Sequence, residues 1–221
     1  MGAAEKPPAL ALSTQVKICG ITRVSDGLLA SELGAYAIGL NFCRESPRYA
    51  QLNDARKICS ALQPYLAVVG VFVNPEASYV YNVLRELPLS LVQFHGRETP
   101  EFCAQFGVPY VKALRVGSDV DLLQYAAWYS PARALLLDAF VAGRHGGTGH
   151  SFDWKLIPRD MPLPIILSGG LNEANVKAAI RQVRPWAVDV ASGVESSPGI
   201  KDAAKMAAFI REVQDADIRP A

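Results

Sequence analysis

Residues 67–73 read Ala-Val-Val-Gly-Val-Phe-Val, and this uninterrupted apolar run indicates the kind of fold. A strand with one solvent-facing side would alternate polar and apolar residues, which this run does not do. A continuous apolar strand is typical of a parallel sheet that is covered by helices on its faces. We therefore expect helical segments on either side of residues 67–73 along the chain.

Seven further short apolar runs alternate with longer stretches of helical character. This alternation predicts a parallel sheet with right-handed crossover connections. The eight expected strands are residues 16–19, 37–42, 67–73, 91–94, 111–114, 134–138, 164–168 and 187–190. The expected helices are residues 25–33, 53–62, 76–87, from 99 onward, within 119–129, near 153–154, 172–182 and 201–213, with N-caps at Ser25, Asn53, Thr99 and Asn172.

Eight such units in a chain of 221 residues favour a closed (β/α)8 barrel, the α/β fold known as the TIM barrel. A doubly wound open sheet is the structural alternative, but it usually has fewer strands, and no GxGxxG motif follows the first predicted strand. We assign residues 16–221 to one barrel domain. Residues 1–15 lack the long apolar segment of a signal peptide, so we expect a short disordered extension there.

Composition and charge argue against several classes of partner and site. The net charge is +1, which gives no electrostatic basis for binding nucleic acid or an anionic membrane. No apolar run approaches the ~20 residues that span a bilayer. The four cysteines form no CxxC pair and no zinc-like cluster, so we expect no metal site. Isolated thiols favour a reducing, cytoplasmic setting.

Polar residues of the predicted barrel gather where its strands end. In barrels of this kind the active site lies at the carboxyl ends of the strands. Six predicted strands lead there into polar or glycine-rich groups, so we expect one site at that rim. The groups are Cys19 with Gly20, residues 46–48, residues 93–96, Asp138, residues 168–170 and residues 189–193.

Two glycine-containing loops predict a phosphate site. Gly169 and Gly170 follow the seventh predicted strand, and Ser192 and Gly193 follow the eighth. Glycine lets the backbone approach an anion closely, and the loops after these two strands are the usual phosphate position in this fold. Either loop alone is more simply explained as a tight turn, whereas the two together favour phosphate binding.

Asp138 and Cys19 are the candidate acid and base groups. Asp138 closes the apolar run 134–137, where a carboxylate needs a partner or a function. Pairing with Arg144 or capping a loop would also explain Asp138. Cys19, taken by itself, fits a small core residue better than a catalyst.

Arg48, His95 and Asp189 are candidates for binding a substrate. A guanidinium can hold a carboxylate through two parallel hydrogen bonds, although a solvated surface arginine explains Arg48 equally well. His95 fits a ligand-facing donor or a structural histidine. Asp189 would orient a hydroxyl or pair with Lys17 inside the barrel. The glycine-rich residues 140–152 fit a lid that closes over the site.

Taken in order from residue 16 to about residue 213, these motifs resemble the phosphoribosylanthranilate isomerase family of tryptophan biosynthesis. So many motifs in one order are far more specific than any one of them. Two departures lie in rim loops, where His150 replaces a frequent lysine and residues 43–45 replace the usual segment. The matching stretches are KICGIT (17–22), SPRY (46–49), GVFVN (70–74), VQFHG (92–96), LLD (136–138), GGTG (146–149), FDW (152–154), LSGGL (167–171) and VDVASGVE (188–195).

The resemblance implies an aldose–ketose isomerase that needs no metal or organic cofactor. N-(5′-phosphoribosyl)anthranilate would undergo an Amadori rearrangement to 1-(2-carboxyphenylamino)-1-deoxyribulose 5-phosphate. Asp138 would be the general acid that opens the ribose ring, and Cys19 the general base that takes the C2′ proton. Arg48 would hold the substrate carboxylate. The loops at Gly169, Gly170, Ser192 and Gly193 would bind the phosphate of this small-molecule partner, and the chain would be a monomer or a homodimer.

Two other readings of the same sequence stay open. Another sugar-phosphate barrel enzyme is the first alternative, but an epimerase would need metal ligands around the rim. An indole-glycerol-phosphate synthase would depend on a catalytic lysine, for which Lys112 is the obvious interior candidate. A barrel that binds a phosphorylated ligand without turnover is the alternative of a different class.

Overall fold

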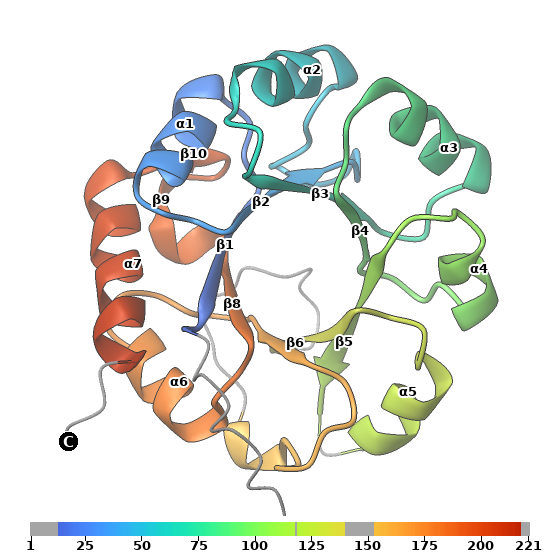
Figure 1. The fold of residues 1–221 in the computed structure, drawn as a ribbon, viewed down its shortest axis with the longest axis vertical. Helices are drawn as coiled ribbons and strands as arrows, with labels where there is room; N and C mark the ends of the chain where they lie inside the picture. The colour runs from blue at the N-terminus through green and yellow to red at the C-terminus, as the bar shows by residue number, and fades with distance from the viewer. Residues whose placement is uncertain (1–12, 118, 140–152, 218–221) are drawn as a thin grey trace, which may run out of the picture.

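The computed structural model describes residues 13–117, 119–139 and 153–217. Eight parallel strands close into a barrel in which each strand pairs with the next and β8 pairs with β1 (Figure 1). This confirms the predicted (β/α)8 barrel, and every predicted strand has its counterpart. The strands are β1 (Gln15–Cys19), β2 (Ala37–Asn41), β3 (Ala67–Phe72), β4 (Leu91–Phe94), β5 (Tyr110–Val116), β6 (Ala134–Ala139), β7 (Ile165–Leu167) and β8 (Ala187–Val190).

Helices form a ring outside the barrel, as Figure 1 shows. Within the described ranges, none of them is long and apolar enough to cross a membrane. A small antiparallel hairpin, β9 (Glu195–Ser197) and β10 (Ile200–Lys201), follows β8. The helices are α1 (Val24–Glu32), α2 (Leu52–Ala61), α3 (Ala77–Glu86), α4 (Pro100–Ala104), α5 (Leu122–Trp128), η1 (Trp154–Leu156), α6 (Val176–Val183), η2 (Ser192–Val194) and α7 (Ala203–Asp217).

Of the predicted N-caps, one is right and three are wrong. Thr99 caps α4, because its side chain accepts a hydrogen bond from the first turn of that helix at 3.2 Å. Ser25 and Asn53 instead lie one residue inside α1 and α2. Asn172 lies four residues before α6, where its side chain accepts a backbone N–H within a turn at 2.9 Å. Short polar side chains bond to turns as readily as to helix ends, so residue type alone does not locate a cap.

The first strand begins one residue earlier than predicted. β1 begins at Gln15, inside the segment expected to be an extension. Thr14 donates its backbone N–H and its hydroxyl to the carboxylate of Asp217, at 2.7 and 2.8 Å, which ties the start of β1 to the end of α7. Residues 1–12 and the predicted lid, residues 140–152, lie outside the described part of the chain.

Apolar side chains pack in two separate groups. The larger group fills the space between the strands and the surrounding helices, and the smaller one fills part of the barrel interior. Strands between two such groups are buried on both faces, which is why residues 67–72 are almost wholly buried in β3. The buried members of the interior group are Val111, Ala113, Ala134, Leu136, Ile166 and Ala187.

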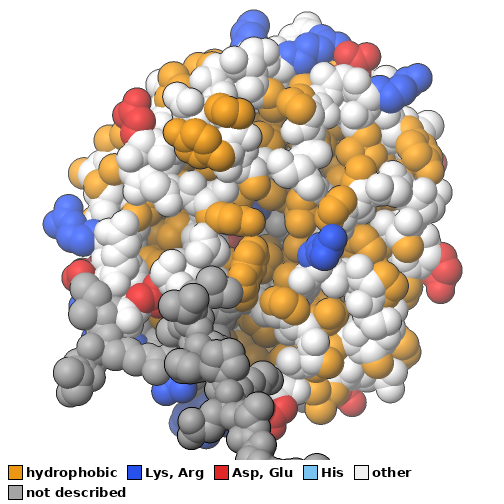
Figure 2. Space-filling model, in the orientation of Figure 1, with side chains coloured by type: hydrophobic (Ala, Val, Ile, Leu, Met, Phe, Trp, Pro, Cys, Tyr) orange, Lys and Arg blue, Asp and Glu red, His pale blue; other side chains and the backbone are white. Residues whose placement is uncertain are grey.

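The barrel interior also holds a buried polar layer between two cavities. Lys17 and Asp189 form an ion pair with 2.7 Å between Nζ and Oδ1, and Gln93 is buried as well. One cavity, of about 400 Å³, lies at the carboxyl ends of the strands. The other, of about 360 Å³, is lined largely by residues at the amino ends, and Gln93 lines both. Figure 2 shows hydrophobic side chains gathered around the centre of the face seen in Figure 1.

Candidate active site

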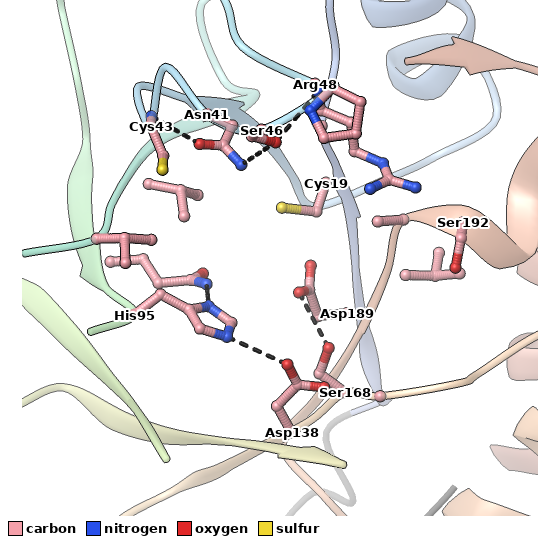
Figure 3. Close-up of a pocket in the computed structure, with 18 of the residues that line it drawn as sticks. Cys19, Asn41, Cys43, Ser46, Arg48, His95, Asp138, Ser168, Asp189 and Ser192 are labelled. Atoms are coloured by element: carbon pink, nitrogen blue, oxygen red, sulfur yellow. Dashed lines mark hydrogen bonds and ion pairs between the residues drawn. The ribbon is translucent and has the colours of Figure 1, made fainter. Parts of the chain in front are cut away.

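The cavity at the carboxyl ends of the strands brings together nearly all of the predicted site residues. It is lined by residues from the ends of strands and from the loops that follow them, as expected for this fold (Figure 3). Gly193 is the predicted residue that does not line the cavity, and it packs behind the lining. The predicted residues that line it are Cys19, Arg48, His95, Asp138, Asp189, Gly169, Gly170 and Ser192.

Asp138 and His95 form a hydrogen-bonded pair on one side of this cavity. Asp138 stands at the end of β6 and is buried, with Oδ2 3.1 Å from Nε2 of His95. The other ring nitrogen of His95, Nδ1, lies 2.9 Å from the side-chain nitrogen of Gln93. An amide nitrogen can only donate, so Nδ1 of His95 accepts and neutral His95 carries its proton on Nε2, facing Asp138. Gln93 therefore fixes the tautomer, a role that the sequence did not reveal.

Cys19 lies at the end of β1, and its thiol points into the cavity in Figure 3. Burial, and then the charge of Asp189, raise the pKa of the Cys19 thiol above its ordinary value. The charge and the hydrogen bond of Lys17, with a smaller contribution from Lys201, act in the opposite direction. The thiol is therefore a weak acid in the free protein, with one buried cation close beside it.

Arg48 is neither solvated nor free of protein partners. Its Nε and Nη2 donate to the two carboxylate oxygens of Glu195, at 2.8 and 2.7 Å, and its side chain is 14% exposed. Although burial opposes it, hydrogen bonds from Arg48 and the charge of Lys201 lower the pKa of Glu195. The interpretation of Arg48 as a surface arginine is wrong. Two of its five N–H groups are occupied, and the others, including both on Nη1, remain for a ligand.

The glycine loops after β7 and β8 meet each other. Gly169 and Gly170 have φ of 84° and 68°, in the left-handed region that favours glycine. A Cβ on Gly193 would lie 2.0 Å from the carbonyl oxygen of Leu171, so only glycine lets these two loops pack so closely. Because α6 begins at Val176, its N-terminus lies further from Gly170 than the sequence suggested. The backbone of these loops borders the cavity.

Asp189 faces the floor of this cavity, where both of its oxygens have protein partners. Oδ1 accepts from Lys17 at 2.7 Å and Oδ2 from the hydroxyl of Ser168 at 3.3 Å. The pairing with Lys17, one of the two roles considered for Asp189, is the one that the structure shows. Lys17 and Cys19 share a face of β1 because side chains two residues apart on a strand point the same way.

Lys112, the candidate lysine of the synthase alternative, does not line the cavity. Its ammonium is 2% exposed and bonds to Glu98 at 3.0 Å and to the carbonyl oxygens of Gly96 and Phe94 at 2.7 and 3.3 Å. An ammonium held in this way supports the turn that carries His95. Among the described residues, no group of three or more His, Cys, Asp or Glu side chains is arranged to hold a metal ion.

Fold and site together define a (β/α)8-barrel enzyme, with a carboxylate and a thiol facing one cavity beside two glycine-rich loops. The family model of N-(5′-phosphoribosyl)anthranilate (PRA) isomerase matches residues 16–212. The chain belongs to this family, and it is an isomerase of tryptophan biosynthesis.

Individual relatives agree with this assignment. The N-(5′-phosphoribosyl)anthranilate isomerase of Nitrosospira multiformis is 56% identical over 202 residues, covering 91% of this chain and 97% of that protein. The crystal structure of phosphoribosyl anthranilate isomerase from Thermotoga maritima superposes with a TM-score of 0.84 at 40% identity, covering 91% of this chain and 99% of that one.

Two further solved structures bear on ligand and assembly. One is a phosphoribosyl anthranilate isomerase in complex with reduced 1-(o-carboxyphenylamino)-1-deoxyribulose 5-phosphate, with a TM-score of 0.80, 40% identity and the same coverage. The other describes monomers generated from the dimeric Thermotoga maritima enzyme, with a TM-score of 0.81. The bound ligand and the dimeric state are those of the two solved structures.

Proposed function

We propose that this chain converts N-(5′-phosphoribosyl)anthranilate into 1-(2-carboxyphenylamino)-1-deoxyribulose 5-phosphate, with Asp138 as the general acid and Cys19 as the general base. The observation that carries this proposal is that Asp138 on β6 and Cys19 on β1 reach one cavity from different strands (Figure 3). Ring opening needs an acid, and removal of a proton from carbon needs a separate base, so two groups on different sides of one substrate suit the reaction.

The first step opens the ribose ring. Asp138 gives a proton to the ring oxygen, the bond from that oxygen to C1′ breaks, and the nitrogen lone pair forms a C1′=N Schiff base. His95 contacts Asp138 through Nε2 at 3.1 Å and is itself fixed by Gln93. This contact orients the carboxyl group of Asp138 within the cavity.

The second step moves a proton from carbon. The Cys19 thiolate takes the C2′ proton, the C–H electron pair forms the C1′=C2′ bond, and the C=N electrons return to nitrogen. The resulting enolamine tautomerises to the ketone, with a proton added at C1′ and one lost from the C2′ hydroxyl. The cationic Schiff base acidifies C2′–H, so a thiolate is a strong enough base for this transfer.

Substrate binding is shared among the other lining groups. The backbone at Gly169, Gly170 and Ser192 suits the phosphate, because glycine removes the side chain that would keep an anion away, and Gly193 behind it lets the two loops pack closely. The N–H groups of Arg48 that Glu195 leaves free suit the anthranilate carboxylate. His95 borders the reacting part of the substrate. Asp189 lies at the base of the site, where it is hydrogen-bonded to Lys17 and Ser168.

Assembly and cellular setting extend the same proposal. We expect a monomer or a homodimer, supported by the dimeric Thermotoga maritima relative. A cytoplasmic setting is supported by the free thiols of Cys19, Cys43, Cys59 and Cys103. Sedimentation of the purified chain over a range of concentrations distinguishes the two assembly states.

The activity is tested with the purified full-length chain and freshly made phosphoribosylanthranilate. We expect loss of the anthranilate-type fluorescence at a rate proportional to the enzyme concentration. A protein that is folded by circular dichroism and binds the reduced product analogue without turnover would instead be a phosphate-ligand binding barrel. That outcome would overturn the isomerase mechanism.

A further inference from the structure

Lys17 and Asp189 form a buried ion pair at the floor of the active site, where Asp189 lines the active-site cavity and Lys17 lines the cavity at the amino ends. The two residues lie opposite each other in the register between β1 and β8. Their side chains are 6% and 5% exposed. A buried ion pair is costly to form and adds little net stability, so its position calls for a reason other than folding.

The Lys17 ammonium and the Cys19 sulfur lie on the same face of β1 and border the same space beside Gly39. Both atoms border Gly39 on the neighbouring strand, where an added Cβ would lie 2.7 Å from Sγ of Cys19 and 3.2 Å from Nζ of Lys17. The absent side chain of Gly39 thus leaves room for the two atoms to approach each other. Asp189 takes one of the three N–H groups of Lys17, and the charge of this ammonium acts on Cys19.

Other charged groups surround Cys19, and each already has a partner. Lys201 on β10 donates to the backbone carbonyls of Cys19 and Ala191 at 2.6 and 3.1 Å and to Glu195 at 2.9 Å, which occupies its three N–H groups. Arg48 is paired with Glu195. Across the cavity, Asp138 is hydrogen-bonded to His95.

We propose that Lys17 is a positioning residue that stabilises the thiolate form of Cys19, and that Asp189 holds the Lys17 ammonium in place for this purpose. The inference rests on the proposed role of Cys19 as the base. The thiol proton leaves to solvent, the thiolate stays beside the ammonium, and it then takes the C2′ proton of the substrate. Lys17 keeps its own proton throughout.

The electrostatics of the pair agree with this role. Although burial lowers it, the charge of Asp189, followed by that of Cys19, raises the pKa of Lys17 to about 12. Lys17 is therefore a cation over the whole range in which a thiol titrates. Its charge opposes the effect of burial on Cys19, whereas the charge of Asp189 adds to that effect. The two members of the pair thus influence the thiol in opposite directions.

The test measures how fast iodoacetamide alkylates Cys19 as a function of pH in the full-length protein. Peptide mass spectrometry separates Cys19 from the other three cysteines. Lys17→Met removes the cation, so we expect the midpoint to move to higher pH and the alkylation rate near pH 7.5 to fall about tenfold for each unit of that movement. Asp189→Asn keeps an oxygen that accepts from Lys17 but removes the negative charge, so we expect the midpoint to move to lower pH.

Lys112→Met is the matched control, because Lys112 is also a buried lysine paired with a carboxylate but stands on β5, whereas Cys19 stands on β1. Its Cys19 midpoint should equal that of the parent protein. The kcat/KM of Lys17→Met should recover toward the parent value as the pH rises, which a merely structural defect would not produce. An unchanged midpoint in Lys17→Met, or an upward movement in Asp189→Asn, would overturn the proposal.

This test is separate from the test of the reaction itself, since alkylation reports the thiol without turnover. If Lys17→Met fails to fold, Lys17→Gln removes the same charge while keeping a side-chain donor for Asp189, and its Cys19 midpoint then decides the proposal. Full activity in Cys19→Ala would show that Cys19 is not the base, whatever the alkylation midpoints are. Failure of the proposed mechanism and failure of this inference therefore give different results.

Discussion

Asp138 and Cys19, the proposed acid and base, each have polar groups close by that would tune their chemistry. Gln93 fixes the tautomer of His95, and His95 in turn contacts Asp138 through Nε2. The sulfur of Cys19 and the buried ammonium of Lys17 border the same space beside Gly39. Changes to single side chains should therefore affect either kcat or KM, depending on whether the residue takes part in the reaction or in substrate binding.

Removing either reactive group should abolish most of the turnover. General acid–base catalysis typically contributes about 10²- to 10⁴-fold, so Cys19→Ala and Asp138→Ala should each lower kcat by at least about 100-fold. The affinity for the reduced product analogue should stay largely intact, because neither change touches the phosphate loops. Steady-state kinetics and calorimetry measure the two effects. Cys59→Ala, on α2 outside the barrel, serves as the control.

Arg48→Ala should act mainly on KM. A hydrogen bond to a charged group is worth about 1.5–3 kcal/mol, so losing it should raise KM by about 10- to 100-fold. Glu195→Gln leaves Arg48 in place but weakens its orientation, so we expect a smaller rise in KM with kcat nearly unchanged. A KM that is unchanged in Arg48→Ala would contradict contact between this guanidinium and the substrate carboxylate.

The rate should depend on pH through Cys19. Its pKa is raised, so the thiolate is scarce at neutral pH and becomes more abundant as the pH increases. The kcat/KM should therefore rise between pH 7 and pH 9 rather than level off below the ordinary thiol pKa of about 8.5. Initial rates in buffers of constant ionic strength measure this profile. A flat profile over this range would argue against a thiolate base.

The β9–β10 hairpin is the element that joins separate parts of the site. Lys201, on β10, donates to the carbonyl oxygens of Cys19 and Ala191 at 2.6 and 3.1 Å, and to Glu195 at 2.9 Å. One buried ammonium thus connects the end of β1, the loop after β8 and the partner of Arg48. The hairpin acts as a brace between these segments.

Lys201→Met should be strongly destabilising. Removing one partner of a buried ion pair leaves an uncompensated charge and typically costs about 3–5 kcal/mol. Chemical denaturation measures the change in the free energy of unfolding. Lys205→Met is the matched control, because this lysine donates to the backbone of Glu195 at 2.8 Å from an exposed position and should cost about 1 kcal/mol or less. Equal losses in the two variants would contradict the bracing role.

Sequence patterns predict the strands more completely than they predict which side chains within the site pair with each other. Residues 67–72 were predictable because burial on both faces leaves a continuous apolar run. The hairpin went unnoticed because strands of two and three residues carry no periodic signal. Arg48 and Glu195 are 147 residues apart, and only closure of the barrel brings them together. The strand ends indicated which residues face the site, whereas their pairing depends on packing that a sequence pattern does not encode.

Closure of the whole barrel depends on joining its first and last strands. β1 and β8 pair in register, and Thr14 is bonded to Asp217 at the end of α7. These contacts connect the two ends of the described chain. Contacts between residues so distant in sequence order the barrel as one unit and are expected to form late in folding.

Asp217→Ala should lower the stability of the barrel without changing its chemistry. Two hydrogen bonds to a carboxylate are lost, so we expect a loss of about 1–3 kcal/mol in the free energy of unfolding and an unchanged KM. Asp215→Ala is the control, since Asp215 forms a longer, half-exposed pair with Lys177 at 3.7 Å that should be worth about 0–1 kcal/mol. Urea denaturation of both variants measures the difference.

The polar layer inside the barrel is also a partition. Lys17 lines the cavity at the amino ends, Asp189 lines the active-site cavity, and Gln93 borders both. Gln93→Ala would remove a side chain that borders both cavities. Water in the space left by that side chain would raise the local dielectric constant and weaken the attraction between Lys17 and Asp189. One uncharged side chain would thus set how strongly the two charges at the floor of the site attract each other.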